Sequence, residues 1–221
     1  MTTKAPFDID QVMQQLREAV KPFHKAAMFE LADDGFKSPF EQLIACIISI
    51  RTYDEVSLPC AKQLFGIART PAEISQLTLP QITAAIHGCT FASEKAIQIQ
   101  AIAKQVVRDF GGELPCDETI MRAFRGVGPK CANLALGIAC GQARISVDIH
   151  VHRVSNRWGY VHAAAPEKTL LALEAILPKA YWVEINRLLV PFGKHICTNQ
   201  HPKCNVCPLL KMCRQVGVTV T

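Results

Sequence analysis

The composition of this 221-residue chain is that of a folded protein with a sizeable core. Hydrophobic residues make up 49% of it, charged residues 19%, and the formal net charge is +5, whereas disordered chains combine low hydrophobicity with high net charge. The longest apolar run, residues 43–50, is far shorter than the roughly 20 residues that cross a bilayer, so we expect no membrane partner.

Amphipathic and capping patterns predict helices in the first half of the chain. Apolar residues at i, i+3 and i+4 positions predict a helix within residues 9–23. A Ser or Thr followed three residues later by Glu or Gln, with Pro at the helix start, predicts further helices beginning at residues 38–41, 70–73 and, more weakly, 78–81. Pro59 should kink or delay the helix expected after Asp54, because proline lacks an N–H group.

Helical signals continue to the end of the chain. Ser93 is expected to cap a long helix that Gly111 ends, and Pro166 and Pro178 are typical of helix starts. No strand-like alternation exceeds four residues. Short polar connections between such helices predict a compact all-α protein.

Ten cysteines divide into a scattered group and a crowded group. We expect the scattered ones to be buried small hydrophobic residues rather than disulfides, because we expect a reducing compartment. The scattered residues are Cys46, Cys60, Cys89, Cys116, Cys131 and Cys140. The crowded ones, Cys197, Cys204, Cys207 and Cys213, supply four soft ligands within 17 residues. Their spacing alone allows either zinc or an iron–sulfur cluster.

Residues 119–139 form two helical halves separated by a short turn. Gly126, Val127 and Gly128 make the turn, and Pro129 is well placed to begin the second helix. The N–H groups of such a turn and helix start can bind a phosphate without any side chain. A plain connection between two helices is an equally good interpretation of the turn alone.

Two polar residues after this turn are candidates for chemistry. Lys130 would lie in the first helical turn, whose positive field favours the neutral, nucleophilic amine; the alternative is a surface lysine that touches phosphate. Asp148 follows an apolar segment and precedes another helix, so it is a candidate helix cap. A capping aspartate can still direct its second oxygen into a cleft.

Three segments together resemble the endonuclease III family of helix-hairpin-helix DNA glycosylases. They are residues 126–130 (Gly-Val-Gly-Pro-Lys), residues 147–153 (Val-Asp-Ile-His-Val-His-Arg) and the four-cysteine segment. Residues 177–213 are also similar to the family, and the resemblance extends from residue 38 to Cys213.

The resemblance implies an all-α, two-lobed fold. Residues 32–142 would form a six-helix lobe that contains the helix-hairpin-helix, and residues 1–31 with 143–221 would form an iron–sulfur cluster lobe. The base pocket would lie between the lobes.

The resemblance implies base excision repair by a bifunctional DNA glycosylase and abasic-site lyase. Lys130 would attack the sugar with help from Asp148, release a damaged base, with oxidised pyrimidines expected, and form a Schiff base. β-Elimination would then cut the strand 3′ to the abasic site. Two alternatives remain open: a glycosylase for uracil, mismatched thymine or a purine lesion, and a non-catalytic iron–sulfur protein that binds DNA.

The same resemblance implies the cofactor and the partner. Cys197, Cys204, Cys207 and Cys213 would hold a 4Fe-4S cluster, which we expect to be structural rather than redox-active in the base-release chemistry. The partner would be double-stranded DNA with a damaged base or an abasic site, bound by a monomer. The first twenty residues lack the apolar segment of a signal peptide, which favours the cytoplasm.

The modest net charge indicates that DNA contacts are local. We expect them at Gly126, Val127 and Gly128 of the hairpin, and the resemblance implies a further contact at Lys203 in the cysteine loop. The resemblance also places Arg51 where the family has a glutamine that fills the space of the displaced base, and Phe91 where a leucine wedge is usual. Such a pair would stack strongly and alter lesion choice; the alternatives are a solvated arginine and a core aromatic.

Overall fold

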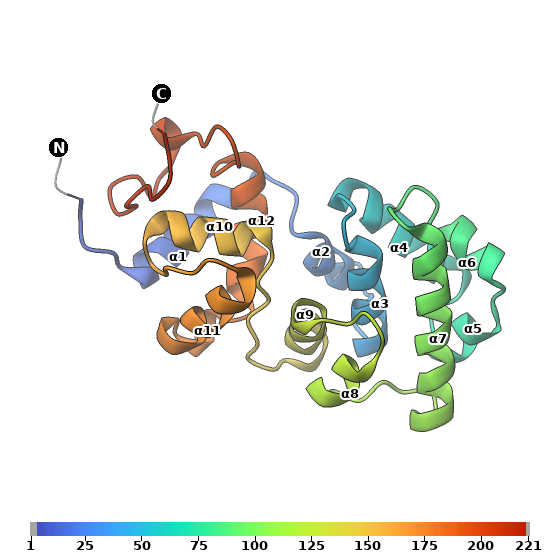
Figure 1. Ribbon diagram of the computed structural model, residues 1–221. Helices are drawn as coiled ribbons and strands as arrows, with labels where there is room; N and C mark the ends of the chain where they lie inside the picture. Colours follow the sequence, from blue (N-terminus) through green and yellow to red (C-terminus); the bar gives the residue numbers. More distant parts are fainter. Residues whose placement is uncertain (1–3, 220–221) are drawn as a thin grey trace. The chain divides into compact units, whose positions relative to one another are not determined.

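All regular elements of the chain are helices in the computed structural model, which describes residues 4–219 (Figure 1). No strand occurs within this range, which confirms the all-α prediction. The elements, including two short 3₁₀ segments, are α1 (Ile9–Val20), α2 (Ala27–Asp33), α3 (Pro39–Ser49), α4 (Asp54–Ile67), α5 (Pro71–Gln76), α6 (Leu79–Ala85), α7 (Ala92–Phe110), α8 (Glu118–Ala123), α9 (Pro129–Cys140), α10 (Ile149–Trp158), α11 (Pro166–Ile176), η1 (Lys179–Tyr181), α12 (Glu184–His195) and η2 (Cys204–Val206).

The helices belong to two compact units. One unit comprises Met1–Ala26 with Ile145–Thr221, and the other comprises Ala27–Arg144. The sequence-based division put the boundaries at 31/32 and 142/143, so α2, which that division split, lies wholly in the second unit.

The unit Ala27–Arg144 is built around α3. Nine consecutive residues of this helix, from Phe40 to Ile48, are buried, and the two polar ones, Glu41 and Gln42, have hydrogen-bond partners. Helix α9 packs against α3, and small residues such as Ala132 and Ala135 let the two backbones approach (Figure 1). Helix α7 packs against α5 and α6 on the other side of the unit.

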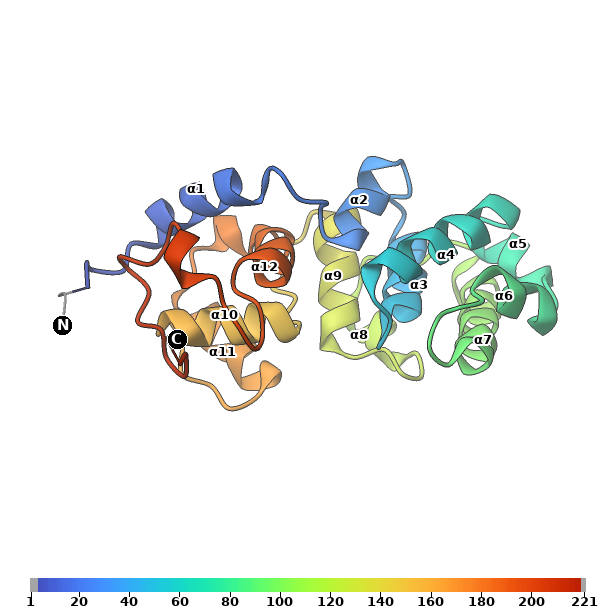
Figure 2. The same cartoon turned by 90° about the horizontal axis from the view of Figure 1, so that it is seen from above.

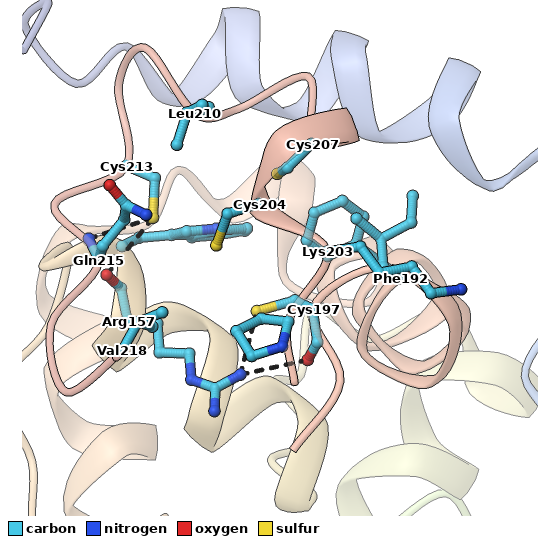
Figure 3. Close-up of a pocket in the computed structure, with 13 residues that line it drawn as sticks. Arg157, Phe192, Cys197, Lys203, Cys204, Cys207, Leu210, Cys213, Gln215 and Val218 are labelled. Carbon is cyan, nitrogen blue, oxygen red and sulfur yellow. Dashed lines mark hydrogen bonds between the residues drawn. The ribbon is translucent and has the colours of Figure 1, made fainter. Parts of the chain in front are cut away.

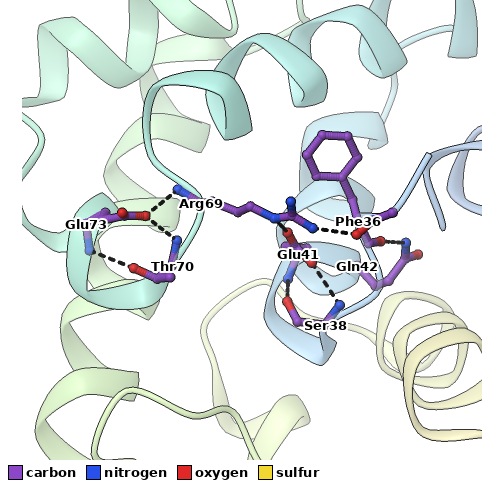
Figure 4. A network of polar contacts seen from close by, with 8 residues as sticks. Phe36, Ser38, Glu41, Gln42, Arg69, Thr70 and Glu73 are labelled. Atoms are coloured by element: carbon purple, nitrogen blue, oxygen red, sulfur yellow. Dashed lines mark hydrogen bonds and ion pairs between the residues drawn. The ribbon is translucent and has the colours of Figure 1, made fainter.

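Two of the predicted helix starts are joined by one arginine (Figure 4). Ser38 and Glu41 cap α3 reciprocally, and Thr70 and Glu73 cap α5 in the same way, as predicted. Arg69 donates its Nε–H to the carboxylate of the buried Glu41, while its backbone N–H donates to Glu73 over 2.8 Å. This ion pair stabilises a carboxylate that burial alone would disfavour.

Three helix boundaries differ from the predictions. Helix α7 has Phe91 at its N-cap, so Ser93 lies within the first turn instead of capping it. Helix α4 begins at Asp54 and continues through Pro59, so the late start is wrong; the missing N–H removes one helical bond without ending the helix. Pro178 precedes the short η1 segment rather than an α-helix.

Four of the six scattered cysteines form disulfides, against the expectation, although Cys46 and Cys131 are buried as expected. Disulfides join Cys46–Cys131 and Cys116–Cys140, whose Cα atoms are 5.6 and 5.9 Å apart, within the range that a disulfide requires. The first links α3 to α9, and the second links the segment before α8 to the end of α9. The other two scattered cysteines are buried free thiols, as expected.

The second core belongs to the unit Met1–Ala26 with Ile145–Thr221. Helix α12 contacts both α1 and α10 (Figure 2). Trp158 and Phe192 are among the largest side chains of this core. Gly193 permits this packing, because a Cβ there would lie 2.6 Å from Nδ1 of His150. No helix within residues 4–219 is long and apolar enough to span a membrane.

Candidate functional site

The hairpin between α8 and α9 has a backbone that only glycine accepts easily. Gly126 has a φ of +79°, and a Cβ built on it would lie 2.8 Å from Nε2 of Gln98. The same Nε2 donates to the Arg125 carbonyl over 2.6 Å, so Gln98 of α7 fixes the backbone at the start of the turn. Gly128 has a φ of −93° and open space around it, and it forms the N-cap of α9.

The hairpin amides differ in their availability. The Val127 side chain is buried, and its N–H donates to the Phe124 carbonyl over 3.1 Å. The N–H groups of Gly126 and Gly128 make no hydrogen bond within the described part of the chain. A phosphate contact by this turn would therefore use the two glycine amides, while Val127 anchors the turn in the core.

Lys130 is the second residue of α9 and is half-buried. No side chain caps this helix, and its first turn contains no acidic residue. The positive end of the α9 dipole, where Lys130 lies, is therefore not offset by any acidic or capping side chain of α9 itself. The sequence-based placement of Lys130 in the first turn is confirmed.

Asp148 is the N-cap of α10. Its Oδ1 accepts hydrogen bonds from the N–H groups of His150 and Val151, over 2.9 and 2.8 Å. Both bonds use the same oxygen, so the capping role engages one half of the carboxylate. Lys130 and Asp148 belong to different units, and each is positioned by the first turn of its own helix.

The four crowded cysteines line one pocket, and Figure 3 shows their sulfur atoms directed into it. Trp158, Phe192 and Leu210 also line it. Burial raises the pKa of Cys207 to about 12 and also raises that of Cys213. Four thiolates in this setting need the positive charge of a metal centre, so the donor set fits one.

The four thiols come from one short segment of the chain and face one pocket. Four cysteine ligands suit either a zinc ion or an iron–sulfur cluster. Within residues 4–219, no group of three or more His, Cys, Asp or Glu side chains is arranged to hold a single metal ion.

Two arginines of α10, which sequence reasoning missed, hold the loop of the first cysteine. Arg153 donates to the carbonyls of Gly193 and Cys197, over 2.8 and 3.0 Å. Arg157 donates to the Cys197 Sγ over 3.5 Å (Figure 3). It also donates to the Thr198 carbonyl over 2.5 Å. Their spacing of four residues places them on one helix face, which was the available signal.

Lys203 lies immediately before η2. Its N–H donates to the Ile196 carbonyl over 2.9 Å, which closes the loop after Cys197, and its side chain is exposed. Lys203 is also one of the residues that line the cysteine pocket, so its positive charge lies near the four thiols and at the protein surface.

Arg51 and Phe91 lie side by side on the surface of the unit Ala27–Arg144. Both have left-handed backbones, with φ of 54° and 59°. The Arg51 guanidinium carbon lies 5.9 Å from the centre of the Phe91 ring. Phe91 is 52% exposed, so its interpretation as a core aromatic is wrong.

Comparisons with known proteins agree on one family. The model for "HhH-GPD superfamily base excision DNA repair protein" matches residues 44–179. Endonuclease III of Thermotoga maritima is 37% identical over 175 residues, which cover 79% of this chain and 82% of that protein. Endonuclease III of Bacillus subtilis is 34% identical over 182 residues, which cover 80% of this chain and 82% of that protein.

Solved structures give the same result. A trapped covalent intermediate of an endonuclease III with DNA has a TM-score of 0.77 at 29% identity, covering 95% of this chain and 97% of that one. A non-covalent endonuclease III–DNA complex has a TM-score of 0.75 at 31% identity, covering 92% of this chain and 95% of that one.

Proposed function

Because the chain belongs to the HhH-GPD superfamily of base excision DNA repair proteins, and within it to the endonuclease III family, we propose that it is a bifunctional DNA glycosylase and abasic-site lyase. One observation carries this proposal: Lys130 lies in an uncapped first helical turn directly after a glycine hairpin. A glycosylase that uses water as its nucleophile needs no amine there.

The chemistry follows from this amine. Once the damaged nucleotide is out of the stack, Lys130 Nζ attacks C1′ of its sugar, the bond from C1′ to the base breaks, and the base leaves with its electron pair. Asp148 takes part as the carboxylate that accepts a proton and stabilises the cationic sugar. The sugar opens to a Schiff base, β-elimination breaks the bond to the 3′ phosphate, and water releases the enzyme.

Oxidised pyrimidines opposite a normal base are the proposed substrates, and duplex DNA bound by a monomer is the proposed form of the complex. Uracil, mismatched thymine and purine lesions remain the alternatives. Single-lesion duplexes compared under single-turnover conditions test this choice, and faster release of uracil or of an oxidised purine would overturn it.

Borohydride trapping tests the nucleophile. The wild type should yield a covalent protein–DNA adduct, because borohydride reduces the Schiff base to a stable amine. Lys130→Gln should abolish the adduct, whereas Lys104→Gln, a change to an exposed lysine on α7, should not. An adduct that persists in Lys130→Gln would place the nucleophile elsewhere, and no adduct in the wild type would favour a non-catalytic DNA-binding protein.

Asp148→Asn separates catalysis from capping. Asparagine caps helices as well as aspartate does, so the fold and DNA affinity should persist while base release is mostly lost. A loss of affinity as large as the loss of rate would instead assign Asp148 a purely structural role.

We also propose that Cys197, Cys204, Cys207 and Cys213 hold a 4Fe-4S cluster as a structural clasp. Two observations support this assignment: the four thiols line one pocket, and their spacing resembles the iron–sulfur motif of the family. Purified protein should contain four iron and four sulfide per chain and absorb visible light. One zinc per chain without visible absorption would overturn the assignment.

A further inference from the structure

The two disulfides of the unit Ala27–Arg144 differ in their access to solvent. Cys46 and Cys131 are 0% and 3% exposed, so a dissolved thiol cannot reach the bond between them in the folded protein. Cys116, by contrast, is exposed, and its partner Cys140 is half-buried. Thiol–disulfide exchange requires an attacking thiolate to reach one of the two sulfur atoms. The Cys116–Cys140 bond is therefore the one of the two that can exchange without unfolding.

This accessible bond closes a loop that contains the whole hairpin. Cys116 lies just before α8, and Cys140 is the last residue of α9 (Figure 1). Between them lie α8, the turn at residues 126–128 with its two glycine amides, and the first turn of α9 with Lys130. The parts of the hairpin that the proposed function brings to DNA thus lie inside one covalent loop.

Helix α8 depends on this closure, because its own packing is slight. Of its six residues, one, Met121, is buried. Two hydrogen bonds support the disulfide at the same end of the hairpin: Gln142 donates to the Cys116 carbonyl over 2.8 Å, and Arg144 donates to the Glu118 carboxylate over 2.5 Å. Water competes with both bonds, because these side chains are only half-buried. The disulfide is the link that water cannot replace.

We propose that Cys116 and Cys140 form a thiol-exchange site through which small disulfides control the binding of DNA by the hairpin. The proposal rests on the proposed function, which makes DNA the partner of the turn. Closing the bond restricts the motion of α8 and the turn before DNA arrives, so less conformational freedom is lost on binding. The oxidised protein should therefore bind duplex DNA more tightly than the reduced protein.

The exchange balances with a disulfide of low molecular weight, such as oxidised glutathione, as the oxidant. The Cys116 thiolate attacks one sulfur of that disulfide, which forms a mixed disulfide and releases one small thiolate. The Cys140 thiolate then attacks the Cys116 sulfur and displaces the second small thiolate. Two electrons pass from the protein thiols to the small disulfide, and the two released thiolates take up the two protons. Excess small thiol reverses both steps.

Peptide mapping after alkylation tests the exchange site without DNA. The protein is equilibrated anaerobically in mixtures of reduced and oxidised glutathione, and free thiols are then alkylated with iodoacetamide. Cys116 and Cys140 should become alkylated together as the excess of thiol rises, while Cys46 and Cys131 stay unmodified. Equal exchange of the buried pair, or alkylation of Cys116 that is complete or absent in every mixture, would overturn the proposal.

Fluorescence anisotropy with a duplex that carries a tetrahydrofuran abasic analogue tests the control of binding. At one fixed salt concentration, the oxidised protein should bind at least about fivefold more tightly than the reduced protein, which is the lower end of the usual range for coupled sites. Because such coupling is reciprocal, saturating DNA should make the disulfide harder to reduce by the same factor. Equal affinities, or an exchange equilibrium that DNA does not shift, would overturn the coupling.

Single variants assign the effect to this pair. Cys116→Ser and Cys140→Ser should both bind DNA as the reduced wild type does, in every glutathione mixture. Cys60→Ala, which removes a buried free thiol on α4, is the matched control and should keep the dependence of the wild type. All three variants retain the four crowded cysteines, so any effect of glutathione on those is common to them. A redox-dependent affinity that persists in Cys116→Ser would overturn the assignment.

Borohydride trapping separates this proposal from the proposed function. A trapped adduct together with an affinity that does not depend on the glutathione mixture would refute the control of binding and leave the enzyme intact. Exchange at Cys116 without DNA binding in either form would refute the proposed function, and the control of binding with it.

Discussion

Replacing Gly126 with alanine should damage the hairpin in two separable ways. Its left-handed φ of +79° costs alanine about 1–2 kcal/mol. The new Cβ would also displace the Gln98 amide, whose hydrogen bond to Arg125 is worth about 1 kcal/mol. We therefore expect Gly126→Ala to lower the free energy of unfolding by about 2–3 kcal/mol.

Chemical denaturation with a double-mutant cycle measures both parts. In a Gln98→Ala background the steric and hydrogen-bond losses have already occurred, so Gly126→Ala should cost only the backbone strain. A coupling of about 1 kcal/mol between the two sites is expected. A Gly126→Ala cost below about 0.5 kcal/mol, or no coupling, would refute this account of the turn.

Gly128→Ala is the matched variant in the same hairpin. Its φ is negative and no atom lies within 4 Å of the added Cβ, so stability should change by less than about 1 kcal/mol. Affinity for an abasic-analogue duplex should nevertheless fall, because the methyl group lies where the DNA backbone would approach the turn. Unchanged affinity would show that DNA does not contact this amide.

Three further outcomes concern stability. Arg69→Ala leaves the buried Glu41 carboxylate without its ion pair and should cost about 2 kcal/mol in chemical denaturation, whereas Arg108→Ala, at an exposed pair, should leave the melting temperature unchanged. Cys116→Ser opens a disulfide between residues 24 positions apart. It should lower the free energy of unfolding by up to about 3 kcal/mol under oxidising conditions and by almost nothing in excess reductant. An equal loss of stability in both conditions would refute the disulfide. Burial raises the pKa of Cys89 from an ordinary 9.0 to about 12. Between these pH values the unfolded chain holds fewer protons than the folded one, so the free energy of unfolding should fall as pH rises. Cys89→Ala should make this fall less steep, and an unchanged slope would contradict the burial effect.

Signals contained within a few residues predicted the structure well. The capping boxes at 38–41 and 70–73 were readable because the hydroxyl, the carboxylate and the amides that they satisfy lie within one turn. The same holds for Lys130 in the first turn of α9 and for Asp148 at the N-cap of α10, because both places depend only on the next few residues.

Features that depend on distant contacts were not readable. The Cys46–Cys131 pair spans 85 residues, so no local pattern distinguishes these thiols from buried hydrophobic residues. Phe91, with a left-handed backbone, is the N-cap of α7 in place of Ser93, and the residue before it, Thr90, donates to the Arg51 carbonyl 39 residues away in sequence. Arg153 was passed over because its acceptors, the Gly193 and Cys197 carbonyls, are about forty residues away.

Helix α10 connects the proposed cluster site to Asp148. Asp148 is the N-cap of this helix, and Arg153 and Arg157 on its later turns are bonded to the Cys197 loop. A metal centre bound by Cys197 would fix that loop, and the two arginines would carry the constraint to α10. The positive charge of the half-buried Arg153 would in turn partly neutralise the thiolates beside it. A cluster at this site would thus hold the helix that bears the Asp148 carboxylate, a role that requires no electron transfer.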